Sequence, residues 1–259
     1  MPYGRARQES APTKTAQVEL MFNRIAPAYD TLNHGMSLGI DYYWRRHVLD
    51  YLAAALGRTG QDQAGPGRTG QKQMDFLDIG TGTGDFAIAV ARRFAPKRLI
   101  GIDISSRMMA LARRKVRQQG LDDTITLQRA DCLDMPFADD TFDVATVAFG
   151  IRNLENLDKG LGEICRVLKT GGHIAIAELS RPQHFPARQL FTVYSHTMLP
   201  LCGHLFPRDA QAYRYLTASI EAFPQAEQMA TALARAGFGH ITFRRMTMGL
   251  CTLYIGVKN

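Results

Sequence analysis

Between residues 75 and 180 the chain alternates short apolar segments with segments that have the apolar spacing of an amphipathic helix. Five apolar segments are predicted strands: DFLDIG (75–80), RLIGIDI (98–104), ITLQRA (125–130), FDVATVAF (142–149) and HIAIAELS (173–180). Strands that are apolar on both faces are typical of a parallel sheet that helices cover on both sides. Two later segments, HITFRRMT and GLCTLYIGVK, follow each other closely and predict an antiparallel pair. The pattern therefore predicts a doubly wound α/β fold around a mostly parallel sheet of seven strands.

Helical segments outside this alternation predict a cap over the sheet. Helical apolar spacing occurs at 18–25 and again at 42–56. The stretch between them, TLNHGMSLG, predicts a loop because it is rich in Asn, Gly and Ser. Residues 183–222 are again mostly helical in pattern. We therefore expect a helical cap built from 15–56 and 183–222.

Two polar tracts fall outside the predicted elements. Residues 1–14 predict a disordered tail. Residues 57–73 contain the tract GRTGQ twice, which is too few copies for a repeat architecture, and predict a flexible surface insertion. The remaining length, 15–259, is expected to form a single domain with a large core.

Composition limits the function classes. Lys and Arg number 31 against 24 Asp and Glu, so the formal charge is 31 − 24 = +7, which suits nucleic acid, an anionic membrane or an acidic substrate. Nucleic acid is disfavoured, because the basic residues are dispersed and no Asn-Pro-Pro-Tyr-type tetrapeptide follows the fourth predicted strand. The four cysteines form no C-x-x-C pair, so we expect neither disulfides nor a metal site. Without a secretory signal or a long apolar run, we expect a cytoplasmic location.

A glycine-rich turn closes the first predicted strand and indicates a nucleotide-type cofactor. Its glycines, Gly80, Gly82 and Gly84, have the spacing G-x-G-x-G, whereas dinucleotide-binding loops have G-x-G-x-x-G. Asp78 and Asp85 flank the turn. Carboxylates repel a pyrophosphate but suit the ammonium and sulfonium charges of S-adenosylmethionine. The alternative is that the glycines only form a tight strand-to-helix turn.

Carboxylates at the next two strand ends favour the cofactor interpretation. Asp103 lies 103 − 84 = 19 positions after Gly84, where a carboxylate can accept both ribose hydroxyls of a nucleoside. Asp131 ends the third predicted strand and could accept a hydrogen bond from an adenine amino group, with Ala130 and Cys132 beside the ring. Three successive strand ends with these residues predict a site for S-adenosylmethionine.

At this point the chain resembles the ubiquinone/menaquinone biosynthesis C-methyltransferase family. The resemblance runs from Met21 to the C-terminus apart from the insertion, and it rests on five segments: MFNRIAPAYDTLNHGMSLGIDYYWRR, LDIGTGTGD, GIDISSRMM, FGIRNLENLDKGLGEICRVLKTGGHIAIAELSRP and DAQAYRYLTASIEAFP. It implies a class I S-adenosylmethionine-dependent methyltransferase fold with the substrate under the helical cap. The cofactor positions that it implies are Thr83, Asp103, Asp131 and Cys132.

The same resemblance implies C-methylation of a prenylated quinol. Ala148 stands where ubiquinone-pathway members often have Ser, which favours the naphthoquinol demethylmenaquinol as acceptor. A benzoquinol intermediate of ubiquinone biosynthesis and another small aromatic acceptor remain the alternatives. A ring carbon becomes nucleophilic when the adjacent hydroxyl ionises, and free phenols ionise near pH ~10. The site therefore needs a base, a water held by one, or a cation that stabilises the phenolate.

Arg152 and Asn153 are the leading catalytic candidates, because they follow the fourth predicted strand at the edge where the crevice of such a sheet lies. The alternative for Arg152 is a structural ion pair with an Asp or Glu. Asp30 is a candidate base, and Tyr29 beside it could close over the cofactor. Both could instead be structural residues of a helix end.

The second half of the predicted cap supplies further candidates. His196 is a candidate catalytic residue and Tyr194 a candidate substrate contact, both in the apolar segment LFTVYSHTMLPLCGHLF. Tyr213 and Tyr215 could cover the substrate ring. For each of these side chains, ordinary packing in a core is the alternative.

The apolar segment and the positive charge together suit a peripheral protein that contacts an anionic membrane, where a prenylated quinol resides. We therefore expect a cytoplasmic location at the inner face of the membrane. Simple burial of this segment is the alternative. The oligomeric state stays open, with a homodimer as one possibility.

Overall fold

The computed structural model describes residues 13–37, 39–57, 73–193 and 210–259. Most of the predicted tail and of the predicted insertion lies outside these residues. The first helix, α1 (Lys14–Ile25), begins within the predicted tail. It starts there because the Thr13 hydroxyl accepts a hydrogen bond from the Ala16 amide at 3.2 Å, which caps the helix.

A seven-stranded sheet forms the centre of the fold, in the order β3-β2-β1-β4-β5-β7-β6. Its strands are β1 (Asp75–Ile79), β2 (Arg98–Asp103), β3 (Ile125–Arg129), β4 (Phe142–Ala148), β5 (Leu168–Leu179), β6 (Phe238–Met246) and β7 (Cys251–Lys258). Strands β1 to β5 pair in parallel, whereas β7 is antiparallel to both β5 and β6. The predicted mostly parallel sheet and its antiparallel final pair are confirmed.

Helices cover both faces of this sheet. One face carries α3 (Ile40–Ala55), α4 (Asp85–Phe94) and α5 (Ser106–Gln118), and the other carries α6 (Leu157–Val167) and α10 (Glu227–Arg235). The central strands are buried on both sides, and for this reason they are apolar throughout rather than alternating.

Helix α3 differs from its expected place. We expected all of 15–56 to form the cap, but α3 lies against β5 and β7, and Trp44, Leu49 and Leu52 are buried in the core of that layer. The sheet covers the apolar face of α3, so only the first turns of this helix line a cavity.

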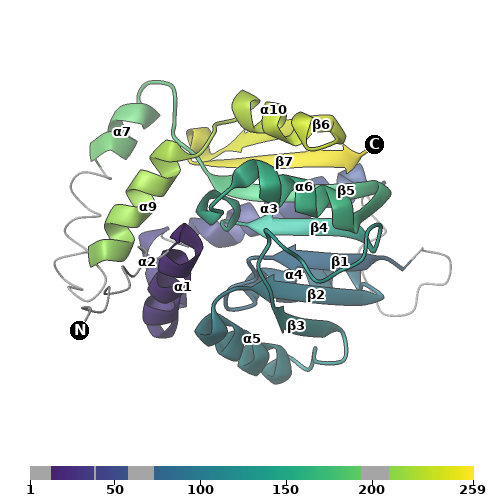
Figure 1. Cartoon of the computed structure of the whole chain (residues 1–259). Helices are drawn as coiled ribbons and strands as arrows, with labels where there is room; N and C mark the ends of the chain where they lie inside the picture. The colour runs from purple at the N-terminus through teal and green to yellow at the C-terminus, as the bar shows by residue number, and fades with distance from the viewer. Residues whose placement is uncertain (1–12, 38, 58–72, 194–209) are drawn as a thin grey trace, which may run out of the picture.

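The remaining helices, α1, α2 (Tyr29–Met36), α7 (Ala187–Val193) and α9 (Ala210–Ala222), gather at one end of the sheet (Figure 1). The predicted loop at 31–39 is wrong over most of its length, since α2 continues to Met36. The Ser37 amide donates to the Asn33 carbonyl at 3.0 Å, and α2 packs against α3. This packing outweighs the weak helix propensity of Asn and Gly.

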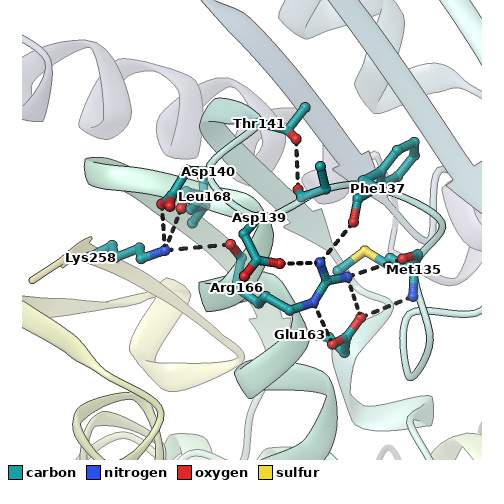
Figure 2. Close-up of polar contacts among 10 residues, drawn as sticks. Met135, Phe137, Asp139, Asp140, Thr141, Glu163, Arg166, Leu168 and Lys258 are labelled. Carbon is teal, nitrogen blue, oxygen red and sulfur yellow. Dashed lines mark hydrogen bonds and ion pairs between the residues drawn. The ribbon is translucent and has the colours of Figure 1, made fainter.

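A polar cluster on the α6 side holds the connection between β3 and β4 in place (Figure 2). Arg166 donates from Nε to Glu163 at 2.8 Å, from Nη1 to the Phe137 carbonyl and to Asp139 at 2.7 Å each, and from Nη2 to the Met135 carbonyl at 3.1 Å. Every nitrogen of this guanidinium is hydrogen-bonded, which marks Arg166 as a structural arginine.

Candidate active site

The glycine-rich turn joins β1 to α4 in a conformation that favours glycine. Gly80, Gly82 and Gly84 have φ of 66°, 56° and 86°. Gly84 also lies close to α5, and a Cβ added there would sit 3.2 Å from the Ala112 Cβ. The turn therefore needs glycine both for backbone conformation and for close packing against α5.

Asp103 ends β2 beside this turn, and backbone amides fix its carboxylate. Oδ2 accepts from the Gly82 amide at 2.9 Å and Oδ1 from the Ser105 amide at 2.8 Å. Burial raises the pKa of Asp103, and these amide hydrogen bonds oppose that rise. The carboxylate is thus oriented by the glycine-rich turn and by the start of α5.

A cavity of about 860 Å³, which we call the loop cavity, opens beside the turn. Its walls include Asp103, Asp131 and Cys132 together with apolar side chains of β4 and α5. The Asp131 carboxylate accepts from the Leu133 amide at 2.9 Å. Burial raises the pKa of the Cys132 thiol to about 12, so this side chain is a neutral, weakly polar wall. Carboxylates among apolar walls fit a nucleoside, which has hydroxyl and amino donors around a flat ring.

A smaller cavity of about 370 Å³, the link cavity, adjoins the turn on the side of α4. Asp78, Thr83 and Arg45 contribute to its walls. The Thr146 hydroxyl donates to Asp78 at 2.7 Å, while burial raises the pKa of Asp78 to about 6. This buried carboxyl suits a cationic group, which would stabilise its ionised form.

The largest of these three cavities, about 1390 Å³, lies beneath the helices at the end of the sheet, and we call it the cap cavity. Its lining is mainly apolar and comes from α3, α7, α9 and the turn before β7: Ile40, Trp44, Ala187, Leu190, Phe191, Leu216, Ile220, Met248 and Leu250. Tyr29 and Phe149 line all three cavities. These two aromatic side chains therefore mark the junction between the loop cavity and the cap cavity.

Arg152 lines the cap cavity and forms a buried ion pair with Glu178, with Nη1 and Oε1 2.5 Å apart. The structural ion pair that we held as the alternative is therefore present. Asn153, its neighbour, lines the loop cavity instead. The structure thus separates the two leading candidates between two cavities.

Asp30 links the cap helix α2 to the glycine-rich turn and to α5. Its Oδ1 accepts from the Thr83 hydroxyl at 2.7 Å, and its Oδ2 lies 2.6 Å from the Lys115 ammonium. It lines none of the three cavities described above. These contacts hold α2 against the glycine-rich turn and α5, and the role of Asp30 as a catalytic base stays a prediction.

Of the remaining candidate residues, the structure describes the side chain of Tyr215 but not the others. His196, Tyr194 and the side chain of Tyr213 lie outside the described residues. Tyr215 has a buried hydroxyl for which no described residue is a hydrogen-bond partner. Sequence reasoning missed Glu178 and Phe149, although Glu178 is a charged residue near the end of an apolar strand, the same signal that identified Asp103.

A family model described as the ubiE/COQ5 methyltransferase family matches residues 10–258. The chain is 49% identical over 245 residues to a demethylmenaquinone methyltransferase of Bacteroides fragilis, covering 95% of this chain and 94% of that protein. It is 38% identical over 246 residues to a ubiquinone/menaquinone biosynthesis C-methyltransferase of Geobacter sulfurreducens, covering 95% and 90%.

Solved structures support the fold. A SAM-dependent methyltransferase of Thermotoga maritima, described as a possible histamine N-methyltransferase, superposes with a TM-score of 0.58 at 17% identity and covers 93% of this chain and 99% of its own. A geranyl diphosphate C-methyltransferase of Streptomyces coelicolor superposes with a TM-score of 0.55 at 17% identity, covering 82% and 78%. The predicted class I methyltransferase fold is confirmed.

Proposed function

The chain belongs to the ubiE/COQ5 methyltransferase family and is an S-adenosylmethionine-dependent methyltransferase, and we propose that its acceptor is a ring carbon of demethylmenaquinol. The observation that carries this proposal is the junction at Tyr29 and Phe149. There, a cavity walled by carboxylates beside a glycine-rich turn meets a larger, mainly apolar cavity.

The residues of the loop cavity fit the cofactor. The fixed carboxylate of Asp103 suits ribose hydroxyls, and Asp131 and Cys132 suit the polar edge and the face of adenine. Gly82 allows a close backbone approach, and Asp78 in the link cavity suits the ammonium group. When bound, S-adenosylmethionine supplies an electrophilic methyl group.

The cap cavity fits the acceptor. Its apolar walls suit a naphthalene ring and the first part of a prenyl chain. Ala148 lines both the loop cavity and the link cavity, so the position that favours a naphthoquinol over a benzoquinol lies beside the junction.

Arg152 supplies the activation that the acceptor needs. Its guanidinium lies in the wall of a mainly apolar cavity and is paired with Glu178, so it acts on a neighbouring quinol oxygen by donating a hydrogen bond to it. It lowers the pKa of a quinol hydroxyl held there and stabilises the phenolate. The ring carbon next to that oxygen thereby becomes nucleophilic.

Incubation with labelled S-adenosylmethionine and two acceptors, reduced demethylmenaquinol and its benzoquinol analogue, tests the proposal. We expect label on the naphthoquinol. Label on the benzoquinol alone would overturn the choice of ring. No transfer to either, with S-adenosylhomocysteine still bound, would overturn the quinol assignment.

We also propose that the α7 side of the cap contacts an anionic membrane at its inner, cytoplasmic face. Phe185, Leu190 and Met248 are 81%, 63% and 67% exposed, and the last two also line the cap cavity. Arg181 and Arg188 are exposed in the same segment and suit anionic head groups. None of the described helices has the length and apolar character needed to cross a bilayer.

Vesicle flotation tests this contact. Binding to phosphatidylglycerol vesicles should weaken about tenfold in Phe185→Ser, because one large apolar side chain no longer enters the interface. Leu20→Ser is the matched control, since Leu20 is 63% exposed on α1 and lines none of the cavities. Equal flotation of wild type and both variants would contradict the proposal.

A further inference from the structure

Glu178 is a fully buried carboxylate at the second-last position of β5. Its Oε1 accepts from Arg152 Nη1 at 2.5 Å and from the Leu179 amide at 2.7 Å, and its Oε2 accepts from the Arg152 amide at 3.2 Å. The free energy needed to remove both charges of a buried ion pair from water can exceed the attraction between them, so such a pair is weak evidence for a role in stability. The pair is better explained by what it does to the guanidinium.

Glu178 and the Phe149 carbonyl together fix the orientation of Arg152. Both accept from the same nitrogen, Nη1, at 2.5 Å and 2.6 Å. The Nε–H is also buried, but it has no hydrogen-bond partner among the described residues. A buried donor without a partner is costly, so it suggests a partner that comes from outside the chain.

Arg166, a second arginine paired with a glutamate, differs from Arg152 in its hydrogen bonds. It pairs with Glu163 as Arg152 pairs with Glu178, but its Nε, Nη1 and Nη2 are all hydrogen-bonded (Figure 2). Neither Arg166 nor Glu163 lines any of the three cavities. Among the described residues, a buried Nε–H without a partner occurs at Arg152 and Arg45, and both of these arginines line the cap cavity, whereas Arg166 does not.

Tyr215, next in the chain to the cavity-lining Leu216, supplies another buried donor without a described partner. It lies on α9, which packs against the 3-10 turn that contains Arg152 (Ile151–Asn153). Its hydroxyl is buried without a described partner. Burial raises the pKa of Tyr215, and the charge of Arg152 lowers it while that of Glu178 raises it, so both charges act on this hydroxyl.

We propose that Glu178 is a positioning residue that holds Arg152 so that its Nε–H, together with the hydroxyl of Tyr215, binds the ionising oxygen of the acceptor ring. This inference rests on the proposed function, since it names the residues that recognise the quinol oxygen. The acceptor oxygen satisfies both donors, and the negative charge that develops on it is stabilised by both.

The test uses Tyr215→Phe with a short-chain demethylmenaquinol and saturating S-adenosylmethionine between about pH 6 and pH 10. Removing a donor raises the pKa of the bound acceptor, because the phenolate is less stabilised. We expect the pH of half-maximal kcat to rise by about one unit and kcat near neutral pH to fall about tenfold. Tyr254→Phe is the matched control, as Tyr254 accepts from the Ala226 amide at 2.9 Å in a structural role.

A second set of variants tests Glu178. We expect Glu178→Gln to lower kcat about tenfold or more, and the double variant with Arg152→Lys to be no slower than Arg152→Lys alone, because Glu178 acts through Arg152. Glu163→Gln, the matched control at Arg166, should keep the wild-type kcat. S-adenosylhomocysteine affinity should stay unchanged in Tyr215→Phe and in Glu178→Gln.

An unshifted pH profile in Tyr215→Phe, or additive effects of the Glu178 and Arg152 substitutions, would overturn the inference. If Glu178→Gln does not fold, Tyr215→Phe alone still decides whether the oxygen site exists. Failure of the wild-type protein to methylate any quinol would instead overturn the proposed function, so the two failures are distinguishable.

Discussion

Replacement of Gly84 by alanine should destabilise the protein. The size of the loss tests whether the backbone conformation at this position requires glycine or only accepts it. Gly84 has φ of 86°, where an L-residue costs about 1–2 kcal/mol. The new Cβ would also lie 3.2 Å from the Ala112 Cβ, and overpacking of this kind adds about 1 kcal/mol. The expected loss is therefore about 2–3 kcal/mol in the free energy of unfolding, which corresponds to a Tm about 4–12 °C lower for a chain of this size.

Gly162→Ala is the matched control. Gly162 lies in the interior of α6, and a Cβ there would meet nothing within 4 Å. Alanine should stabilise the helix by about 1 kcal/mol and raise Tm by about 2–4 °C. Thermal unfolding followed by circular dichroism compares the two variants with wild type. A Tm for Gly84→Ala at or above the wild-type value would refute the argument from conformation and packing.

Three further outcomes follow from the site. Asp103→Asn should weaken S-adenosylhomocysteine binding about tenfold or more in calorimetry, because hydrogen bonds to a carboxylate are stronger than those to an amide; unchanged affinity would contradict its ribose role. Lys115→Met leaves the carboxylates of Asp30 and Asp85 without the ammonium that lies 2.6 Å from each, so proteolysis of the cap should be faster than in wild type. Asp78 has a pKa of about 6 in the folded protein, above its unfolded value, so its contribution to stability is lost as pH rises from about 4 to 6. Urea unfolding should show wild type losing up to about 3 kcal/mol relative to Asp78→Asn over that range, and parallel curves would refute the shift.

The sequence by itself determined the sheet and the position of the glycine-rich turn with its neighbouring carboxylates. The strands that carry Asp78 and Asp103 are apolar runs of four to eight residues, and such runs can be recognised in the sequence without knowledge of distant contacts. The spacing of the glycines in the turn is also a local signal, because each residue with positive φ favours glycine whatever its distant neighbours are. Parallel strands bring their carboxyl ends to one edge of the sheet, so the sequence alone predicts that these carboxylates lie close together.

Only the tertiary structure decided the cap and the acceptor side. Residues 31–36 are helical because α2 packs against α3, which local propensity does not encode. Arg152 is paired with Glu178, 26 residues away, and Asp30 with Lys115 across two helices of different layers. The sequence identified Arg152 and Asp30 as candidates and left Glu178 and Lys115 unnoticed. An ion pair between distant positions follows from how the elements pack, so only the structure shows that Arg152 lines the cap cavity whereas Asp30 joins α2 to α5.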